Sequence, residues 1–190
     1  FESQVAPTAT LDDLDMDKVS AYIQALGLPG EEPLEQILLR RGCLLPLPVA
    51  STSKAVGTVK TSPLRPTYAA LLLFGKHPQQ WLPNASILAA RFSGATLADQ
   101  FIKQEINGTL VEQMLQAEAF MRNNLRSVVR LVGLARQETL EYPLEALREL
   151  LVNAVAHRQY EDAGRKIILE VFADRVNILS PGLPPAPLTL

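Results

Sequence analysis

Glu149, Asn153 and His157 recur at every fourth position of a segment whose other residues are mostly apolar. At about 100° per residue the three form one stripe, opposite an apolar stripe that includes Leu147 and Leu151. A carboxylate can accept a proton, and a carboxamide offers a neutral oxygen to a hard cation such as Mg²⁺. The four-residue spacing places the first two side chains about 6 Å apart. The stripe is therefore a candidate site for proton transfer and cation binding.

Two interpretations of this polar stripe remain open. The polar face of an amphipathic helix usually meets water. However, the small residues Ala146 and Ala156 flank the stripe, it carries no lysine, and a β-hairpin pattern follows it directly. These three details favour the wall of a cavity.

The helix that carries the stripe is expected to begin at Pro143, which suits a first helical turn, and to run to about Tyr160. Inward and outward residues then alternate over 167–172, a turn falls at 174–175, and a second strand follows at 176–178. The sequence therefore predicts a helix packed next to a β-hairpin.

Upstream, capping residues, helix-breaking glycines and hydrophobic spacing predict further elements. They are a helix from Asp12 or Asp15 to about Leu26, helices at 33–41 and 67–74, strands at 85–92 and 101–106, and a long helix at 109–129. Arg122, Arg126 and Arg130 would share one solvated face of the long helix.

We expect an α+β fold, with helices packed on a mixed or antiparallel β-sheet. The predicted organisation is a helical lead-in at 1–45, a loop or weak hairpin at 46–66, and an α+β domain at 67–190.

The helix and hairpin at 143–182 carry a family resemblance. A helix with Glu-x-x-x-Asn, followed by strand, turn, strand and a glycine-containing loop, resembles the start of the ATP-binding domain of the gyrase, heat-shock chaperone, histidine-kinase and mismatch-repair (GHKL) superfamily. LRELLVNAVAHRQY, FADRVNILSPGLPP and PTYAALLLFGKHPQQWLPNASILAARFSG together resemble bacterial transcriptional regulators of the RecG-related or Schlafen-AlbA type. This second resemblance extends over most of the chain, from about residue 10 to residue 190.

The resemblance implies a role for each polar residue. Glu149 matches the catalytic Glu that polarises the attacking water, and Asn153 matches the Asn that binds the Mg²⁺ between the phosphates. His157 would lie near phosphate or ribose, although a hydrogen-bonded structural histidine fits equally well. Ser180 and Gly182 stand where the superfamily has an Asp that accepts the adenine amino proton and a glycine two residues later. ATP and Mg²⁺ are therefore the expected cofactors, and an adenine nucleotide is the expected partner.

The chain departs from the superfamily in two places. Ser180 can accept a hydrogen bond but lacks the charge of the usual Asp. The superfamily's glycine-rich lid has no counterpart before Leu190, and we expect the chain to be part of a longer protein. Because closure over the phosphates needs such a lid, we expect no ATP turnover by these 190 residues and at most a weak ATPase in the full-length protein.

Composition limits other classes of function. The formal net charge is −2 and the pI is near 5.8, whereas a duplex-binding surface is normally basic. We therefore expect DNA contact only through other parts of the full-length protein. The longest apolar run, 68–74, is too short to cross a bilayer, so no membrane contact is expected. The single Cys43 favours a reducing, cytoplasmic setting.

Two functions are consistent with these observations. The first is an ATP- and Mg²⁺-binding region of a bacterial transcriptional regulator, which modulates a neighbouring DNA-binding domain. The alternative is a degenerate GHKL-like module that binds no nucleotide and serves dimerisation or protein interaction. Glu149 and Asn153 favour the first, and Ser180 and the missing lid favour the second. The oligomeric state stays open, a homodimer included.

Overall fold

The computed structural model of the protein describes residues 1–27, 32–47, 63–132 and 135–182. The chain forms two compact units, Phe1–Trp81 and Leu82–Leu190, which are described separately below.

The N-terminal unit combines short helices with a two-stranded sheet. Its elements are η1 (Leu11–Asp13), α1 (Met16–Ala25), α2 (Leu34–Arg40), β1 (Leu44–Pro46), β2 (Leu64–Pro66), α3 (Tyr68–Phe74) and η2 (Pro78–Gln80). Asp15 caps α1, because its side chain accepts hydrogen bonds from the N–H groups of Asp17 (3.1 Å) and Lys18 (3.3 Å). β1 and β2 pair antiparallel at the ends of the predicted loop or weak hairpin, and residues 48–62 of that prediction lie outside the described residues.

The predicted boundary at residue 66 differs from the one in the structure, which falls after Trp81. Leu71 and Phe74 of α3 lie in the same buried cluster as residues of α1 and α2. The apolar side of α3 thus completes the core of the N-terminal unit, and the helical lead-in is too small to enclose a core without it. Cys43 is buried in this cluster, and burial raises the pKa of its thiol.

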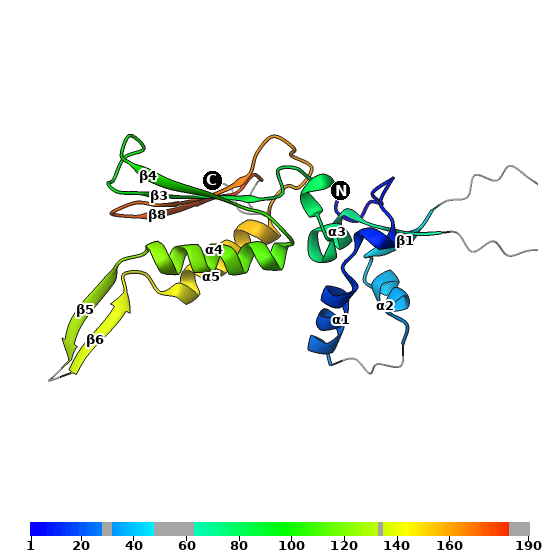
Figure 1. Ribbon diagram of the computed structural model, residues 1–190, viewed down its shortest axis with the longest axis horizontal. Helices are drawn as coiled ribbons and strands as arrows, with labels where there is room; N and C mark the ends of the chain where they lie inside the picture. The colour runs from blue at the N-terminus through cyan, green and yellow to red at the C-terminus, as the bar shows by residue number, and fades with distance from the viewer. Residues whose placement is uncertain (28–31, 48–62, 133–134, 183–190) are drawn as a thin grey trace, which may run out of the picture. The chain divides into compact units, whose positions relative to one another are not determined.

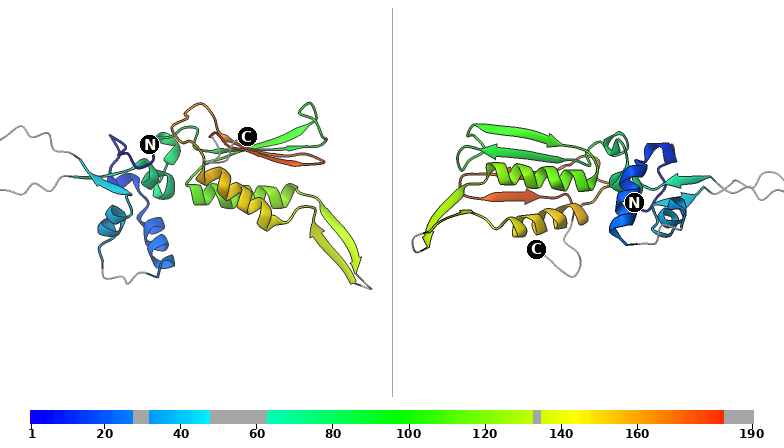
Figure 2. Two further views of the ribbon diagram at one scale, coloured as in Figure 1. Left: turned by 180° about the vertical axis from the view of Figure 1, so that it is seen from behind. Right: turned by 60° about the horizontal axis from the view of Figure 1, so that its bottom comes forward.

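The C-terminal unit is built on a four-stranded sheet with the order β4-β3-β7-β8. Its strands are β3 (Ile87–Phe92), β4 (Phe101–Ile106), β7 (Ile167–Val171) and β8 (Val176–Leu179). β3 is parallel to β7 and antiparallel to β4, and β7 and β8 form an antiparallel hairpin. Figures 1 and 2 show helices along one face of this sheet. The expected α+β class, with helices packed on a mixed sheet, is confirmed.

The helices on that face are α4 (Leu110–Asn124) and α5 (Leu144–Ala156). Their apolar sides and the inward residues of the strands form one buried cluster, which includes Met121 and Leu151. Arg148 of α5 donates two hydrogen bonds, each 2.8 Å long, to the carboxylate of Glu118 on α4 and so links the two helices. This contact holds the pKa of Glu118 at about 2. Every helix in the described ranges is too short or too polar to cross a membrane.

Between α4 and α5 the chain forms a hairpin of β5 (Ser127–Val132) and β6 (Ala135–Leu140), which extends away from the helices in Figures 1 and 2. The predicted helix at 109–129 is therefore wrong in its last part, because α4 ends at Asn124. The β-branched pair at 128–129 favours a strand over continued helix. Arg126 and Arg130 consequently do not extend a basic face of α4.

Candidate functional site

Glu149 and Asn153 meet on the exposed face of α5. Nδ2 of Asn153 donates a hydrogen bond to Oε1 of Glu149 at 3.2 Å. Both side chains are exposed, and the buried Leu147 and Leu151 lie on the opposite face, as helical spacing predicts. Because the amide nitrogen of Asn153 is the donor, the pair presents a carboxylate and a neutral carboxamide oxygen side by side.

A groove of about 700 Å³ runs between one side of α5 and the edge strand β8. It is lined by Leu147, Leu150, Ala154, Val176, Asn177, Ile178, Leu179 and Ser180. Leu150 and Ala154 each directly follow a residue of the predicted pair. The interpretation of the polar stripe as a cavity wall is therefore wrong: its three residues are exposed, as expected for the solvated face of an amphipathic helix, while Leu150 and Ala154 face β8. The alanines at 146 and 156, which flank the stripe, are exposed.

Ser180 lines this groove and also closes the C-terminal end of α5. Its Oγ donates a hydrogen bond to the carbonyl oxygen of Ala154 at 2.6 Å. The hydroxyl of Tyr160 donates in the same way to the carbonyl oxygen of Val155 at 2.9 Å. The last carbonyl groups of a helix have no donors within the helix, so these two hydroxyl groups replace the missing partners. Ser180 therefore has a structural role, and its oxygen keeps lone pairs that can accept a further hydrogen bond.

Gly182 and His157 lie together at the same end of α5. Gly182 has φ +147°, and a Cβ added to it would lie 2.8 Å from the carbonyl oxygen of His157. The N–H of Gln159 donates to the carbonyl oxygen of Pro181 at 2.8 Å, which fixes this loop on the helix end. The residues that line the groove include neither His157, whose side chain is exposed, nor Gly182. The structure thus gives Gly182 a role in the close approach of two backbone segments.

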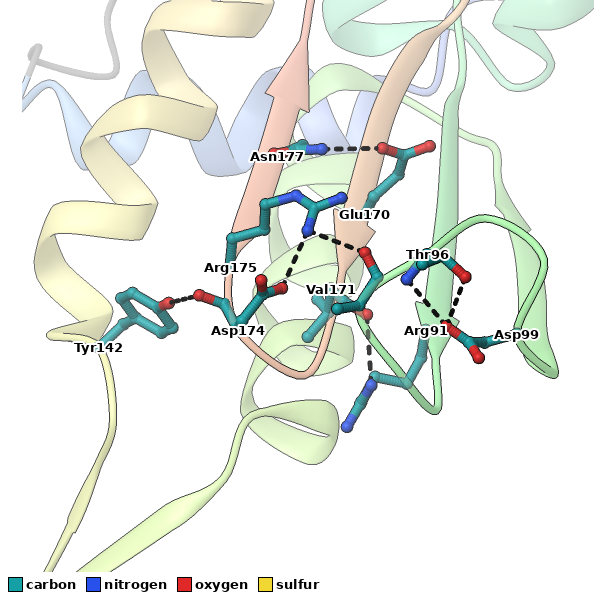
Figure 3. A network of polar contacts seen from close by, with 10 residues as sticks. Arg91, Thr96, Asp99, Tyr142, Glu170, Val171, Asp174, Arg175 and Asn177 are labelled. Carbon is teal, nitrogen blue, oxygen red and sulfur yellow. Dashed lines mark hydrogen bonds and ion pairs between the residues drawn. The ribbon is translucent and has the colours of Figure 1, made fainter.

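The other end of β8 is held by polar contacts around the β7–β8 turn (Figure 3). The guanidinium group of Arg175 donates to Oδ1 of Asp174 and to the carbonyl oxygen of Ala95, both at 2.9 Å, and lies 3.9 Å from the ring centroid of Phe172. The hydroxyl of Tyr142 donates to the carbonyl oxygen of Asp174 at 3.2 Å. These contacts join the turn to the β3–β4 loop and to the segment before α5. Both ends of β8, and hence one wall of the groove, are fixed.

Mg²⁺ has a candidate protein ligand in the carboxamide oxygen of Asn153. Within the described part of the chain, no group of three or more His, Cys, Asp and Glu side chains could hold a metal ion. In proteins Mg²⁺ commonly keeps several waters and binds through one or two side chains and the phosphates of a substrate. Asn153 and Glu149 could supply one or two ligands of this kind, but the pair alone does not supply a full set of protein ligands for the ion.

Arg158 is a buried cation that the spacing of residues in the sequence does not predict. Its Nη2 donates to the carbonyl oxygen of Arg165 at 2.8 Å, and its guanidinium carbon lies 5.0 Å from the ring centroid of Tyr160. Burial lowers the pKa of this guanidinium group. The contacts fix the loop that leads from α5 to β7. No local sequence signal distinguishes a buried arginine at this position from a solvated one.

The fold and the groove define an α+β protein with two helices on one face of a mixed sheet and an open, largely apolar site along the sheet edge. Comparison with known protein families and with curated proteins gave no match. Among solved structures, the DIP2311 protein from Corynebacterium diphtheriae is similar, with a TM-score of 0.65 and 20% sequence identity. The similarity covers 100% of this chain and 35% of that protein, so the chain spans about a third of its length. This likeness supports the fold.

Proposed function

We propose that the C-terminal unit binds ATP with Mg²⁺, as the nucleotide-binding region of a bacterial transcriptional regulator in which it modulates a neighbouring DNA-binding domain. The observation that carries the proposal is the hydrogen-bonded pair of Glu149 and Asn153 beside the groove of α5 and β8. A carboxylate and a carboxamide oxygen stand together there, at the margin of a concave surface.

The groove has the size and chemistry expected for a nucleotide. Its volume of about 700 Å³ lies within the range of about 300–1,000 Å³ that is typical of small-molecule sites. The aliphatic side chains of Leu150 and Ile178 line it and suit the faces of a base, and Ser180 supplies a polar group at one end. Asn153 directly precedes Ala154 of the groove lining, so the polar pair lies at the margin of the groove.

Asn153 and Glu149 would have different roles at the phosphates. Asn153 would contribute its carboxamide oxygen to the ion, and Glu149 would accept a proton from a water that attacks the terminal phosphate. Bound Mg²⁺ would supply positive charge that offsets the charge of the phosphate oxygens. Because both side chains are exposed to solvent here, water is not excluded from them. Binding is therefore the activity that we assign to these residues, and turnover is expected only where further protein covers the pair.

Calorimetric titration of Mg·ATP into the full-length protein tests this proposal. Asn153→Ala should weaken binding more than Glu149→Ala, because the Asn contributes to the bound state whereas the Glu acts mainly in the transition state. Glu145→Ala is a matched control, since it removes an exposed carboxylate from the first turn of the same helix. Loss of affinity equal to that of the control in both variants would contradict the assigned roles.

The alternative, an interaction or dimerisation module without nucleotide, is favoured by a different observation. β8 lies at the edge of the sheet, and the groove beside it exposes Leu150 (55%) and Leu179 (51%). Unpaired strand edges next to exposed apolar residues are suited to pairing with another chain. Light scattering on the full-length protein and on its Leu150→Glu variant separates the two functions. Dissociation of an oligomer by this substitution, together with no binding of Mg·ATP by the unmodified protein, would favour the module.

A further inference from the structure

We propose that two copies of this chain pair through β4, antiparallel about a two-fold axis at Gln104, and so join their sheets into one. β4 and β8 are the two edges of the four-stranded sheet, and Figure 2 shows β4 at the side of the sheet next to β3. The groove of α5 and β8 lies at the other edge. The proposed pairing is therefore independent of nucleotide binding.

β4 is open along most of its length. Its first five residues are exposed, and Ile106 at its end is buried. Two of the exposed side chains are large and apolar, Phe101 (56%) and Ile102 (66%). An edge strand presents a row of backbone N–H and C=O groups that can pair with another strand. β4 has six residues for such pairing, whereas β8 has four and none of them is charged.

The hydrogen bonds to β3 decide which residues of β4 can pair outward. The N–H of Ser93 donates to the carbonyl oxygen of Gln100 at 2.8 Å, and the two strands keep a regular register from there to Ile106. Hydrogen-bonded and non-hydrogen-bonded pairs alternate along an antiparallel ladder. The even-numbered residues of β4 therefore direct their N–H and C=O groups to β3, and the odd-numbered residues direct theirs to the open edge. Two copies can pair only where odd-numbered residues oppose each other.

Charge selects one register among those that the backbone allows. Lys103 and Glu105 are the charged residues of β4, and both are exposed and odd-numbered. With Lys103 of one copy opposite Glu105 of the other, the two-fold axis generates two equivalent ion pairs. A shift of two residues in either direction places Lys103 against Lys103 or Glu105 against Glu105, and like charges directly opposite each other are destabilising. A lysine on an edge strand normally discourages pairing, and Glu105 supplies the one register in which it favours pairing.

The even-numbered residues agree with this register. They lie on the face that carries α4 and α5, because Ile106 belongs to the core cluster with these helices. Gln104 meets Gln104 of the second copy at the axis, and two carboxamide groups can each donate to and accept from the other. Ile102 comes opposite Ile106 of the second copy, in a non-hydrogen-bonded pair where side chains approach closely. The pairing would thus cover the exposed Ile102 beside the core.

Glu105 already has one cation beside it and can accept a second. Nζ of Lys166 lies 2.6 Å from its Oε1, and this hydrogen bond lowers the pKa of the Glu105 carboxyl group. The side chain of Glu105 is still 44% exposed. A carboxylate has two oxygens with about four acceptor positions. Lys103 of the second copy can therefore approach it without displacing Lys166.

Analytical ultracentrifugation of the full-length protein without nucleotide tests the proposal. As the concentration is raised, the mass should change from that of one chain to that of two. Lys103→Glu and Glu105→Lys should each weaken dimerisation by about tenfold, because each converts both ion pairs into like-charge pairs. An equal mixture of the two variants should recover the dimer, because one then has two acidic side chains on β4 and the other two basic ones. Glu145→Lys is the matched control, since it makes the same change of charge at an exposed position of α5.

Several results would overturn the pairing through β4. One is an unmodified protein that keeps the mass of a single chain at every concentration. Another is a dimer that each variant forms as tightly as the unmodified protein does. A third is a mixture that forms no dimer although circular dichroism shows both variants to be folded. Dissociation by Leu150→Glu, with no effect of the substitutions in β4, would place the contact at the groove instead.

Discussion

Substitutions of Ser180 measure how much its hydroxyl group, bonded to the C-terminal end of α5, contributes to the free energy of unfolding. Ser180→Ala removes the hydrogen bond of 2.6 Å to the Ala154 carbonyl. One neutral hydrogen bond of this kind contributes about 1 kcal/mol to the free energy of unfolding. We therefore expect Ser180→Ala to lower the stability of the C-terminal unit by about 1 kcal/mol, which corresponds to a fall in Tm of about 5 °C for a unit of this size.

Ser180→Asp should be more destabilising than Ser180→Ala. An ionised carboxylate has no proton to donate, so it loses the same hydrogen bond. It also places a negative charge against the carbonyl end of α5, where the helix dipole disfavours an anion by about 0.3–1 kcal/mol. The two effects together amount to about 1.3–2 kcal/mol. An aspartate at this position, as in the GHKL pattern, would therefore lower the stability of the C-terminal unit.

Urea denaturation followed by circular dichroism measures both effects. Ser20→Ala is a suitable control, because the hydrogen bond of Ser20 to the Met16 carbonyl, at 2.8 Å, is local to α1 in the N-terminal unit. Its substitution should change stability by less than about 0.5 kcal/mol. If Ser180→Asp proves as stable as the unmodified protein, the hydroxyl does not hold the helix end and the reasoning is wrong.

Three further predictions concern other parts of the structure. The hydrogen bonds from Arg148 hold the pKa of Glu118 at about 2, below its usual 4.5, so the stability that they add to the folded protein is complete above about pH 4.5 and is lost as the pH falls toward 2. In a plot of the urea midpoint against pH, Glu118→Gln should flatten this part of the curve, and an unaltered curve would argue against the contact. Gly182→Ala should lower stability by about 1–3 kcal/mol, measured by thermal denaturation, because its φ of +147° and the 2.8 Å approach to the His157 carbonyl leave no room for a Cβ. The buried Cys43, with its raised pKa, should react with a thiol reagent at pH 8 only after denaturant is added, and rapid reaction of the native protein would show that the thiol is accessible.

Hydrophobic periodicity was sufficient to predict the parts of the fold that bury a continuous face. α5 and the β7–β8 hairpin were predicted because an apolar stripe of period 3.6 and an alternation of period 2 follow one another in the sequence. The strands predicted at 85–92 and 101–106 are present as β3 and β4, which pair antiparallel in the register from Ile87↔Ile106 to Phe92↔Phe101. In α5 and β7 the buried residues recur at the period of the element, so burial explains why the sequence predicts them, whereas β4 is exposed except at Ile106.

The β5–β6 hairpin shows where this reasoning fails. The apolar residues after Asn124 continue a helical spacing, and no Gly or Pro marks the end of α4 before residue 129. The strands pair with each other, from Ser127↔Leu140 to Val132↔Ala135, and the side chains of Val128 and Val129 are exposed and lie outside the core cluster of the unit. A pattern of burial cannot predict a segment that does not enter the core.

The candidate site was predictable in its residue types but not in its position. Helical spacing places Glu149 beside Asn153, and the hydrogen bond of 3.2 Å confirms their proximity. The groove lies beside them, at Leu150 and Ala154, because these residues of α5 face the edge strand β8. The position of β8 relative to α5 is a tertiary feature that the residues of the helix do not predict. The contact of Ser180 with Ala154 joins residues 26 positions apart, and no local rule of capping predicts it.

The hydroxyl of Ser180 has a role at the end of α5 that a carboxylate cannot take. An ionised aspartate at the end of β8 would accept hydrogen bonds strongly, but it has no proton to donate and would leave the Ala154 carbonyl without its partner. The serine donates its proton to that carbonyl and keeps acceptor lone pairs on Oγ. A serine at this position therefore has a structural reason that does not depend on a ligand.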